Sequence, residues 1–177
     1  MTTSRVFGLA GWSGSGKTTL IARLLPALID RGIAVSTLKH AHHDFDIDQP
    51  GKDSWRHRQA GAREVMIASD QRWALMRELR GAAEPAMEEL VRRMSPVDLI
   101  LVEGYKRGNH PKLEIHRAVL GKPLLAATDP TVVAIASDAP LSGVEVPCFA
   151  LDDIGAIAAF ILAHCHIEVM HGGAAQR

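Results

Sequence analysis

Residues 11–19 read GWSGSGKTT, and the fold class that we predict follows from this stretch. It contains the pattern G-x-x-x-x-G-K-[ST], which is typical of a phosphate-binding loop. Glycines allow the backbone to wrap around an anion so that successive N–H groups point at it. A short apolar run, residues 6–10, precedes the stretch, and apolar residues at helical spacing follow it. Strand, loop and helix therefore stand in the order that the motif requires, which predicts a nucleoside triphosphate site.

The charged and hydroxyl residues of this loop have expected roles. The start of the following helix adds unpaired N–H groups and the positive end of its dipole. The Lys17 ammonium is expected to reach the β- and γ-phosphates, and the Thr18 hydroxyl is expected to bind Mg²⁺. A glycine-rich turn without a ligand is the competing interpretation, and the context of strand and helix favours the nucleotide site.

Strands and helices alternate through the rest of the chain, which predicts an α/β fold of the P-loop NTPase type. We expect a mainly parallel sheet flanked by helices, in a single domain that spans residues 1–177. The expected strands after the loop are 33–38, 65–68, 73–79, 99–102, 113–117 and 132–136. Helices are expected after Lys17, from Asp53 to near Gly61, from Pro85 to near Met94 and after Asp152, with Asp53 and Asp152 as N-caps. We expect the tail from about residue 170 to be disordered.

Composition narrows the classes of protein that the chain can represent. Of 177 residues 47% are hydrophobic, which is enough for a globular core. Lys and Arg total 20, as do Asp and Glu, so no net charge favours nucleic acid or membrane partners. The first residues lack the features of a signal peptide, and there is no apolar run of about 18 residues. Cys148 and Cys165 form no paired metal or redox motif, so we expect a cytoplasmic protein.

A second polar stretch, KHAHHDFDID at residues 39–48, follows the second expected strand. Ligands of such folds gather where parallel strands end, so the stretch is expected beside the loop. Asp44 is the favoured Mg²⁺ ligand, directly or through water, because hard cations prefer oxygen. Three interpretations of His40, His42 and His43 stay open. They bind phosphate or substrate, with His42 as the candidate, they bind a transition metal, or they cover a polar surface loop; no fixed Cys/His zinc spacing is present.

A third stretch, LILVEGYK at residues 99–106, is an apolar strand that ends in Glu103 and Gly104. Glu103 is expected opposite Thr18 across the metal, and an ordinary strand-end carboxylate is the alternative. Gly104 is expected to let the chain approach the terminal phosphate closely. Basic residues follow, namely Lys106, Arg107 and Lys112. They form either a solvated face or a site for a second anionic ligand.

Taken together, five segments resemble the molybdopterin-guanine dinucleotide biosynthesis protein B (MobB) family. They are GWSGSGKTTL, LKHAHHDFDIDQPGKDSWRHRQAGA, RWALMREL, LILVEGYK and PKLEIHR, and they span about two thirds of the chain. The phosphate loop is shared by many families, whereas the second segment is far more specific. The resemblance implies a cytoplasmic, homodimeric GTP-binding adapter with weak Mg²⁺-dependent GTPase activity. Its implied partner is the enzyme that attaches GMP to molybdopterin.

The resemblance also implies roles for individual residues. The phosphate-binding positions would be Ser13, Gly14, Ser15, Gly16, Lys17, Thr18 and Thr19. Thr18, Asp44 and Glu103 would surround the metal. Apart from the resemblance, Lys17, Asp44 and Glu103 are our candidates for the residues that act in hydrolysis, and His40, His42, Asp44 and Glu103 all stay open as the group that activates water. The chain has no N-K-x-D motif to read guanine. Asp138 could accept from guanine N1–H and the 2-amino group, or it could be a turn aspartate. The identity of the nucleotide's base is therefore inferred from the resemblance alone.

Two alternative functions share the same loop. A small-molecule kinase would need a lid of arginines over the phosphates, for which Arg56, Arg58 and Arg63 are available. A metallochaperone GTPase would use His42 and His43. As for assembly, the apolar residues 73–76 form an expected edge hairpin with residues 65–68. Open sheet edges invite pairing with another chain, which favours a symmetric dimer.

Overall fold

The computed structural model describes residues 4–41, 45–106 and 108–169. It divides into two compact units, unit 1 within residues 1–40 and 91–177 and unit 2 within residues 41–90. The expectations for His42, His43, Asp44, Arg107 and the tail lie outside the described residues. Among the described helices, none combines the length and the apolar character needed to cross a bilayer.

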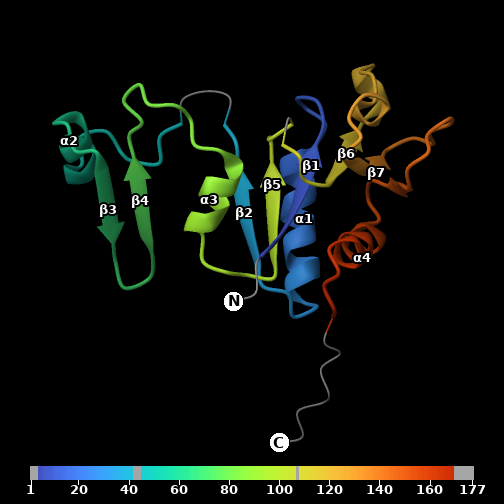
Figure 1. The fold of residues 1–177 in the computed structure, drawn as a ribbon, viewed down its shortest axis with the longest axis horizontal. Coiled ribbons are helices and arrows are strands. Elements are labelled where there is room, and N and C mark those ends of the chain that lie inside the picture. The colour runs from blue at the N-terminus through green and yellow to red at the C-terminus, as the bar shows by residue number, and fades with distance from the viewer. Residues whose placement is uncertain (1–3, 42–44, 107, 170–177) are drawn as a thin grey trace, which may run out of the picture. The chain divides into compact units, whose positions relative to one another are not determined.

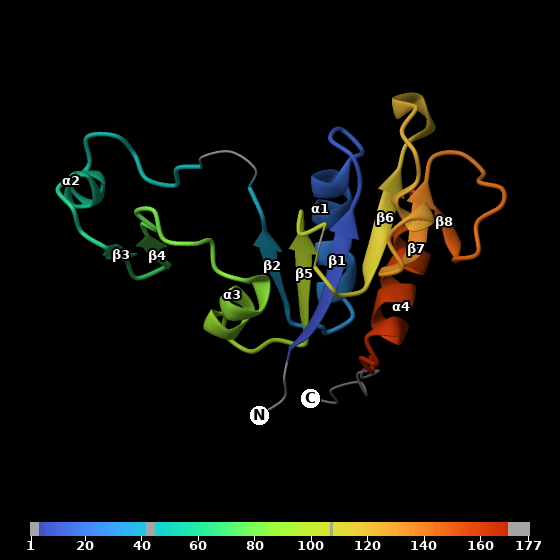
Figure 2. The same ribbon diagram turned by 45° about the horizontal axis from the view of Figure 1, so that its top comes forward.

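Unit 1 is built on a six-stranded sheet of order β2-β5-β1-β6-β7-β8, in which every neighbouring pair is parallel (Figure 1; β8 is labelled in Figure 2). The strands are β1 Arg5–Ala10, β2 Val35–Lys39, β5 Leu99–Glu103, β6 Lys112–His116, β7 Val132–Ser137 and β8 Cys148–Ala150. All residues of β5 are buried, as expected of an apolar strand inside a parallel sheet. The predicted parallel sheet is confirmed, and the short edge strand β8 is an addition to it. Since parallel strands end at one edge, the loops that follow β1, β2, β5, β6 and β7 gather there.

Two helices, α1 (Lys17–Ile29) and α4 (Ile154–His164), pack side by side against the sheet (Figures 1 and 2). Their buried residues recur at helical spacing, as the sequence predicts for α1. The core between helices and sheet includes Phe7, Leu9, Leu24, Leu28, Leu101, Ile115, Ile157 and Ile161, each no more than 2% exposed. Burying one such side chain stabilises the fold by about 1.5–3 kcal/mol. This core holds the start of α1 against the end of β1, where the glycine-rich loop lies.

The helix ends differ from the sequence predictions by one or two residues. Asp153, not Asp152, caps α4, because its carboxylate accepts from the Ala156 N–H at 2.9 Å. A capping side chain must reach donors two or three residues further on, and Asp153 is the residue with that reach. Asp53 lies inside the first turn of α2 (Asp53–Gln59) rather than at its N-cap, and α3 (Met87–Arg93) begins two residues after Pro85. The short turns η1 (Ala118–Leu120) and η2 (Leu125–Ala127) complete unit 1.

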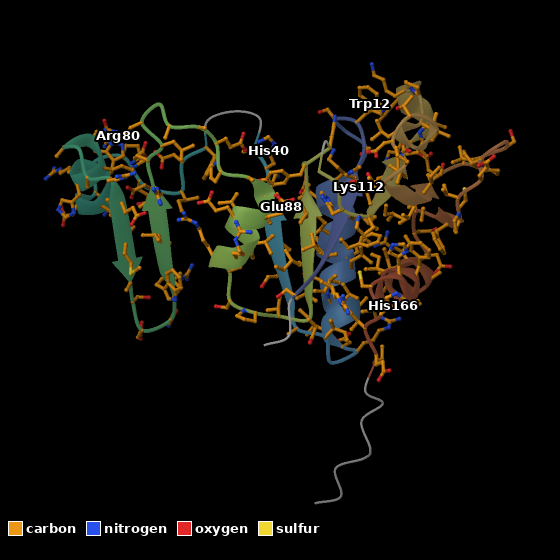
Figure 3. The ribbon with its side chains drawn as sticks, in the orientation of Figure 1. Trp12, His40, Arg80, Glu88, Lys112 and His166 are labelled. Atoms are coloured by element: carbon orange, nitrogen blue, oxygen red, sulfur yellow. The ribbon has the colours of Figure 1, made fainter. Side chains whose placement is uncertain are left out.

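Unit 2 contains α2 and an antiparallel hairpin of β3 (Glu64–Ala68) and β4 (Trp73–Arg77), which confirms the expected pair of strands. Arg58 of α2 connects its parts. Its guanidinium lies 2.6 Å from Asp46 and 3.0 Å from Glu78, and the hydrogen bond lowers the pKa of Asp46. The Arg80 side chain, labelled in Figure 3, donates to the Arg58 carbonyl at 2.9 Å. The family-specific segment LKHAHHDFDIDQPGKDSWRHRQAGA therefore includes residues that stabilise unit 2. Because Arg58 is held in these contacts, it is not free to join the arginine lid that a kinase would need.

Candidate functional site

The glycine-rich loop connects β1 to α1 at the carboxyl edge of the sheet. Gly11 has a φ of 151°, and a Cβ there would lie 2.6 Å from the Ile115 carbonyl oxygen, so only glycine fits beside β6. Gly16 is the left-handed N-cap of α1, with a φ of 96°. The Ser15 N–H donates to the Trp12 carbonyl at 3.1 Å, which closes a turn inside the loop. The backbone thus curls back on itself before α1 begins, as the motif predicts.

Lys17 directs its ammonium into this curl. Its Nζ donates to the carbonyl oxygens of Gly11 and Trp12, both at 3.0 Å. Burial lowers the pKa of Lys17; nearby Glu103 raises it, and the positive charges of Lys106 and Lys39 lower it further. Charged residues that end or follow β2 and β5 therefore lie near a partly buried ammonium of the loop. Such a group is stabilised by a bound anion, since opposite charge favours the protonated form.

The Ser15 side chain gives a second indication of a ligand. Ser15 is 1% exposed, and its hydroxyl has no hydrogen-bond partner among the described residues. A buried polar group without a partner is costly and calls for an explanation, and a ligand that supplies the missing partner is one. The neighbouring candidates Ser13, Gly14, Thr18 and Thr19 are exposed, and Gly16 and Lys17 are half-buried. The loop thus presents both buried and accessible polar groups at one place.

The structure brings Thr18 and Glu103 together. Thr18 Oγ1 lies 3.1 Å and 3.3 Å from the two carboxylate oxygens of Glu103, which is 8% exposed. The Lys39 ammonium, at the end of β2, lies 3.9 Å from Glu103 Oε1. A hydroxyl and a carboxylate side by side are the hard oxygen donors that suit Mg²⁺, with phosphate and water as further ligands. Their arrangement beside the loop fits a magnesium ion.

The need for glycine at position 104 is explained by its packing against His40, in addition to the close approach to phosphate that the sequence suggested. Its φ is 101°, and a Cβ at this position would lie 2.9 Å from the His40 carbonyl oxygen. The His40 N–H donates to the Glu103 carbonyl at 2.8 Å, and the His40 and Tyr105 rings lie 4.8 Å apart. His40, labelled in Figure 3, therefore belongs to the same edge of the sheet as Glu103. No group of three or more His, Cys, Asp or Glu residues suited to a metal occurs in the described part of the chain.

Arg117 lies against the loop, although the sequence alone indicated no role for it. Its Nε donates to the Ser15 carbonyl at 3.1 Å, and its Nη1 lies 3.6 Å from Asp138 Oδ2. The other oxygen, Asp138 Oδ1, accepts from the Ala118 N–H at 2.9 Å. Both oxygens of Asp138 thus have partners within the chain, which favours the turn aspartate over the guanine reader. Arg117 follows β6, and its position at the end of a parallel strand is the signal that could have identified it.

Trp12 is the second unanticipated residue of the site. Its indole N–H donates to the Pro123 carbonyl at 2.8 Å. The ammonium groups of Lys106 and Lys122 lie 5.1 Å and 5.7 Å from the centroid of its ring, which is the range of cation–π contacts. Figure 3 shows Trp12 beyond the end of β1, outside the sheet. The Trp12 ring therefore helps to hold the ammonium groups of Lys106 and Lys122 near the loop.

The expected basic patch of Lys106, Arg107 and Lys112 is corrected at Lys112. This lysine, labelled in Figure 3, is 1% exposed. Its Nζ donates to the Gly108 carbonyl at 2.6 Å and to the Thr131 hydroxyl, and lies 3.3 Å from Asp129 Oδ2. A buried ammonium must be paired and hydrogen-bonded in this way because its desolvation is costly. Lys112 therefore stabilises the sheet and does not form a surface site with Lys106.

Comparisons with known proteins agree with these features. The family model for "Molybdopterin guanine dinucleotide synthesis protein B" matches residues 6–138. The chain is 44% identical over 160 residues to the molybdopterin-guanine dinucleotide biosynthesis adapter protein of Escherichia coli (strain K12), covering 89% of this chain and 91% of that protein. It is 41% identical over 166 residues to the protein of the same description from Haemophilus influenzae, covering 91% of each.

A solved structure shares the fold as well. The crystal structure described as molybdopterin-guanine biosynthesis protein B (mobB) superimposes with a TM-score of 0.72 at 28% identity, covering 90% of this chain and 99% of that chain. These similarities confirm the family resemblance and the P-loop type of fold that the sequence predicted. The names of the relatives give no support to a kinase or a metallochaperone.

Proposed function

Because the chain belongs to the molybdopterin guanine dinucleotide synthesis protein B family, we propose that it is an adapter of molybdopterin guanine dinucleotide biosynthesis that binds GTP with Mg²⁺. The observation that carries the proposal is the Lys17 ammonium inside the glycine-rich loop, with Thr18 and Glu103 beside it. The adapter description of the two relatives, each matched over about nine tenths of its length, supports the biological setting. A cytoplasmic location is part of the proposal.

The loop supplies most of the binding energy in this proposal. Backbone N–H groups of the loop and the start of α1 donate to the phosphates, and Lys17 adds a charge-assisted contact. Ser13, Ser15 and Thr19 supply hydroxyl donors. Thr18 and Glu103 would hold Mg²⁺, which neutralises charge between the phosphates when it is bound. Asp44 as a further carboxylate near the metal, and His42 as a phosphate contact, enter the proposal from the sequence alone.

Hydrolysis by the isolated protein is slow in this proposal. Phosphoryl transfer depends mainly on positioning and on positive charge added at the transferring group. Arg117, an arginine beside the loop, is engaged by the Ser15 carbonyl and by Asp138. An arginine in those contacts braces the loop rather than the transferring phosphate. We therefore expect turnover far below the ~1–100 s⁻¹ typical of kinases, which is consistent with an adapter.

A homodimer formed through the hairpin of unit 2 completes the proposal. One face of the hairpin carries the cross-strand pairs Met66–Leu75 and Ala68–Trp73. Met66 is 62%, Leu75 45% and Trp73 66% exposed, so the face has an accessible apolar part, which the Glu64–Arg77 ion pair borders. An isolated two-stranded hairpin is marginally stable in water, and covering its apolar face would stabilise it. A second copy offers the same face, so the contact is self-complementary in a two-fold dimer.

A binding screen on the purified chain tests the proposal. Isothermal titration calorimetry with GTP, ATP and GMP, each with and without Mg²⁺, should show tightest binding for GTP with Mg²⁺. The partner is tested by co-elution with the enzyme that attaches GMP to molybdopterin. Absence of nucleotide binding would overturn the nucleotide site. Binding without co-elution would overturn the adapter role and leave the nucleotide site supported.

A further inference from the structure

The contact between Arg117 and the loop has a consequence for how the loop presents its donors. Arg117 Nε donates to the Ser15 carbonyl at 3.1 Å. A Cβ at Gly16 would lie 3.5 Å from Arg117 Nη2 and 3.6 Å from Nε, so the guanidinium lies beside Gly16 as well as at the Ser15 carbonyl. The arginine therefore contacts one particular peptide unit of the loop.

A trans peptide is planar, so its carbonyl and its N–H point in opposite directions. By holding the Ser15 carbonyl on one side, Arg117 turns the Gly16 N–H to the other side, away from the guanidinium. The Gly16 N–H has no acceptor among the described residues. A charged donor at the carbonyl also polarises the peptide, because hydrogen bonds in series strengthen one another. The Gly16 N–H is thus both oriented and made a stronger donor.

Asp138 fixes Arg117 in turn. Asp138 Oδ2 lies 3.6 Å from Arg117 Nη1, and Oδ1 accepts from the backbone N–H of Ala118, the next residue, at 2.9 Å. The carboxylate therefore holds both the side chain of Arg117 and the backbone that carries it. The Arg117 and Asp138 side chains are 38% and 30% exposed, so the ion pair alone contributes little. Its importance lies in geometry, because it connects the end of β7 to the phosphate loop through β6.

We propose that Arg117 is a positioning residue for the phosphate loop, which orients the Gly16 N–H toward the nucleotide's β-phosphate, and that Asp138 sets the position of Arg117. This inference rests on the nucleotide site proposed above. It gives Asp138 a structural role in binding instead of a role in reading the base. The two roles predict different patterns of nucleotide affinity, which makes them separable.

The test compares Arg117→Gln with wild type by calorimetry for GDP and GMP, with Arg23→Gln as the matched control. Arg23, on α1, also donates to a backbone carbonyl, that of Asp152 at 3.2 Å. Arg117→Gln should weaken GDP binding by roughly 10- to 100-fold, as expected for a hydrogen bond to a charged group, and change GMP binding little. Arg23→Gln should change neither. Arg117→Lys, which keeps the charge without the fork, should recover part of the loss.

Asp138→Asn provides a second, independent arm. If Asp138 positions Arg117, this variant weakens GDP and xanthosine diphosphate alike and has little further effect in the Arg117→Gln background. A switch of preference toward xanthosine diphosphate would overturn the inference, because it would mean that Asp138 reads the base. Equal loss of GDP and GMP in Arg117→Gln, or no loss at all, would also overturn it. Wild type that binds no nucleotide would overturn the nucleotide site itself.

Discussion

Thr18 and Glu103 are 85 positions apart in the sequence, yet Thr18 Oγ1 lies 3.1 Å from Glu103 Oε1. The parallel pairing of β1 with β5 brings them together, because Leu9 lies opposite Glu103 in the register. The glycine-rich loop connects the end of β1 to the start of α1, where Thr18 lies. Two oxygen donors from separate segments thus meet beside the phosphate loop, and this relationship can be tested through the metal.

Glu103→Gln should reduce the dependence of GTP affinity on Mg²⁺. The substitution keeps the size of the side chain and removes the charge that a hard cation prefers. Loss of even an outer-shell partner of a metal costs roughly 10–100-fold in metal affinity, so a loss of at least that size is expected. The measurement is the ratio of GTP affinity with Mg²⁺ to that with chelator.

Glu88→Gln is the matched control, because Glu88 is an exposed carboxylate in the part of α3 that belongs to unit 2 (labelled in Figure 3). It should keep the wild-type ratio. A Glu103→Gln protein with an unchanged ratio would show that Glu103 is not a ligand of the metal.

Lys17→Ala should lose most affinity for GTP while the fold survives. The ammonium is the loop's own cation, and alanine is well tolerated near the start of a helix. Burial lowers the pKa of Lys17 below its ordinary value of 10.5. The charged form is therefore complete below that lowered pKa and is lost as pH rises through it. GTP affinity of wild type should fall on the alkaline side, whereas the weak residual affinity of Lys17→Ala should not show this fall.

Calorimetry across neutral to alkaline pH checks both parts, with circular dichroism to confirm folding. Wild-type GTP affinity in a folded Lys17→Ala protein would remove the basis for a phosphate site in this loop.

Trp73→Glu should convert the proposed dimer to a monomer. Trp73 is 66% exposed on the apolar face of the hairpin, and a carboxylate there would be buried against its symmetry mate. Sedimentation velocity over a range of concentrations measures the change. Val119→Glu is the control, because Val119 is 85% exposed but lies in η1 of unit 1. Wild type that sediments as a monomer at every concentration would refute the dimer.

The two cysteines should differ in reactivity toward iodoacetamide. Burial raises the pKa of Cys165 to about 11, so the thiolate, which is the reactive form, is scarce at neutral pH. Cys148 is exposed at the edge strand β8. Peptide mapping of native protein should find label on Cys148 only, and denaturant should expose Cys165. Equal labelling in the native state would contradict the packing of Cys165 in the core.

The sequence predicted those parts of the site whose cause is local. The loop of residues 11–18 was predictable because its glycines, lysine and threonine form one continuous motif, which can be recognised without knowing any distant contact. Glu103 was predictable because an apolar run ends there, and the end of a parallel strand is where ligands gather. The helix caps were wrong by one residue. At Asp152 the adjacent Asp153 offers the same carboxylate, and the sequence does not choose between the two. At Asp53 the N-cap is Lys52, whose side chain makes no capping hydrogen bond, so α2 begins one residue earlier than a capping aspartate would place it.

The parts that were missed depend on contacts between distant segments. Lys112 was assigned to a surface patch because the residues that bury and pair it, Asp129 and Thr131, lie 17 and 19 positions further on. Arg117 contacts Ser15 across 102 positions, and no local pattern indicates this. Such contacts follow from the order of strands in the sheet. The alternation of helices and strands along the sequence does not reveal that order.

The two bonds from Lys17 to its own loop bear on the thermodynamics of recognition. An ammonium has three N–H donors, and two of them are directed to the carbonyls of Gly11 and Trp12. The third N–H therefore has a fixed direction. Ordering a lysine side chain costs up to about 1.5–2 kcal/mol in rotamer entropy, and here folding bears that cost before any nucleotide arrives. The loop is in this sense preorganised, so that association immobilises the nucleotide without also having to immobilise the cation that meets it.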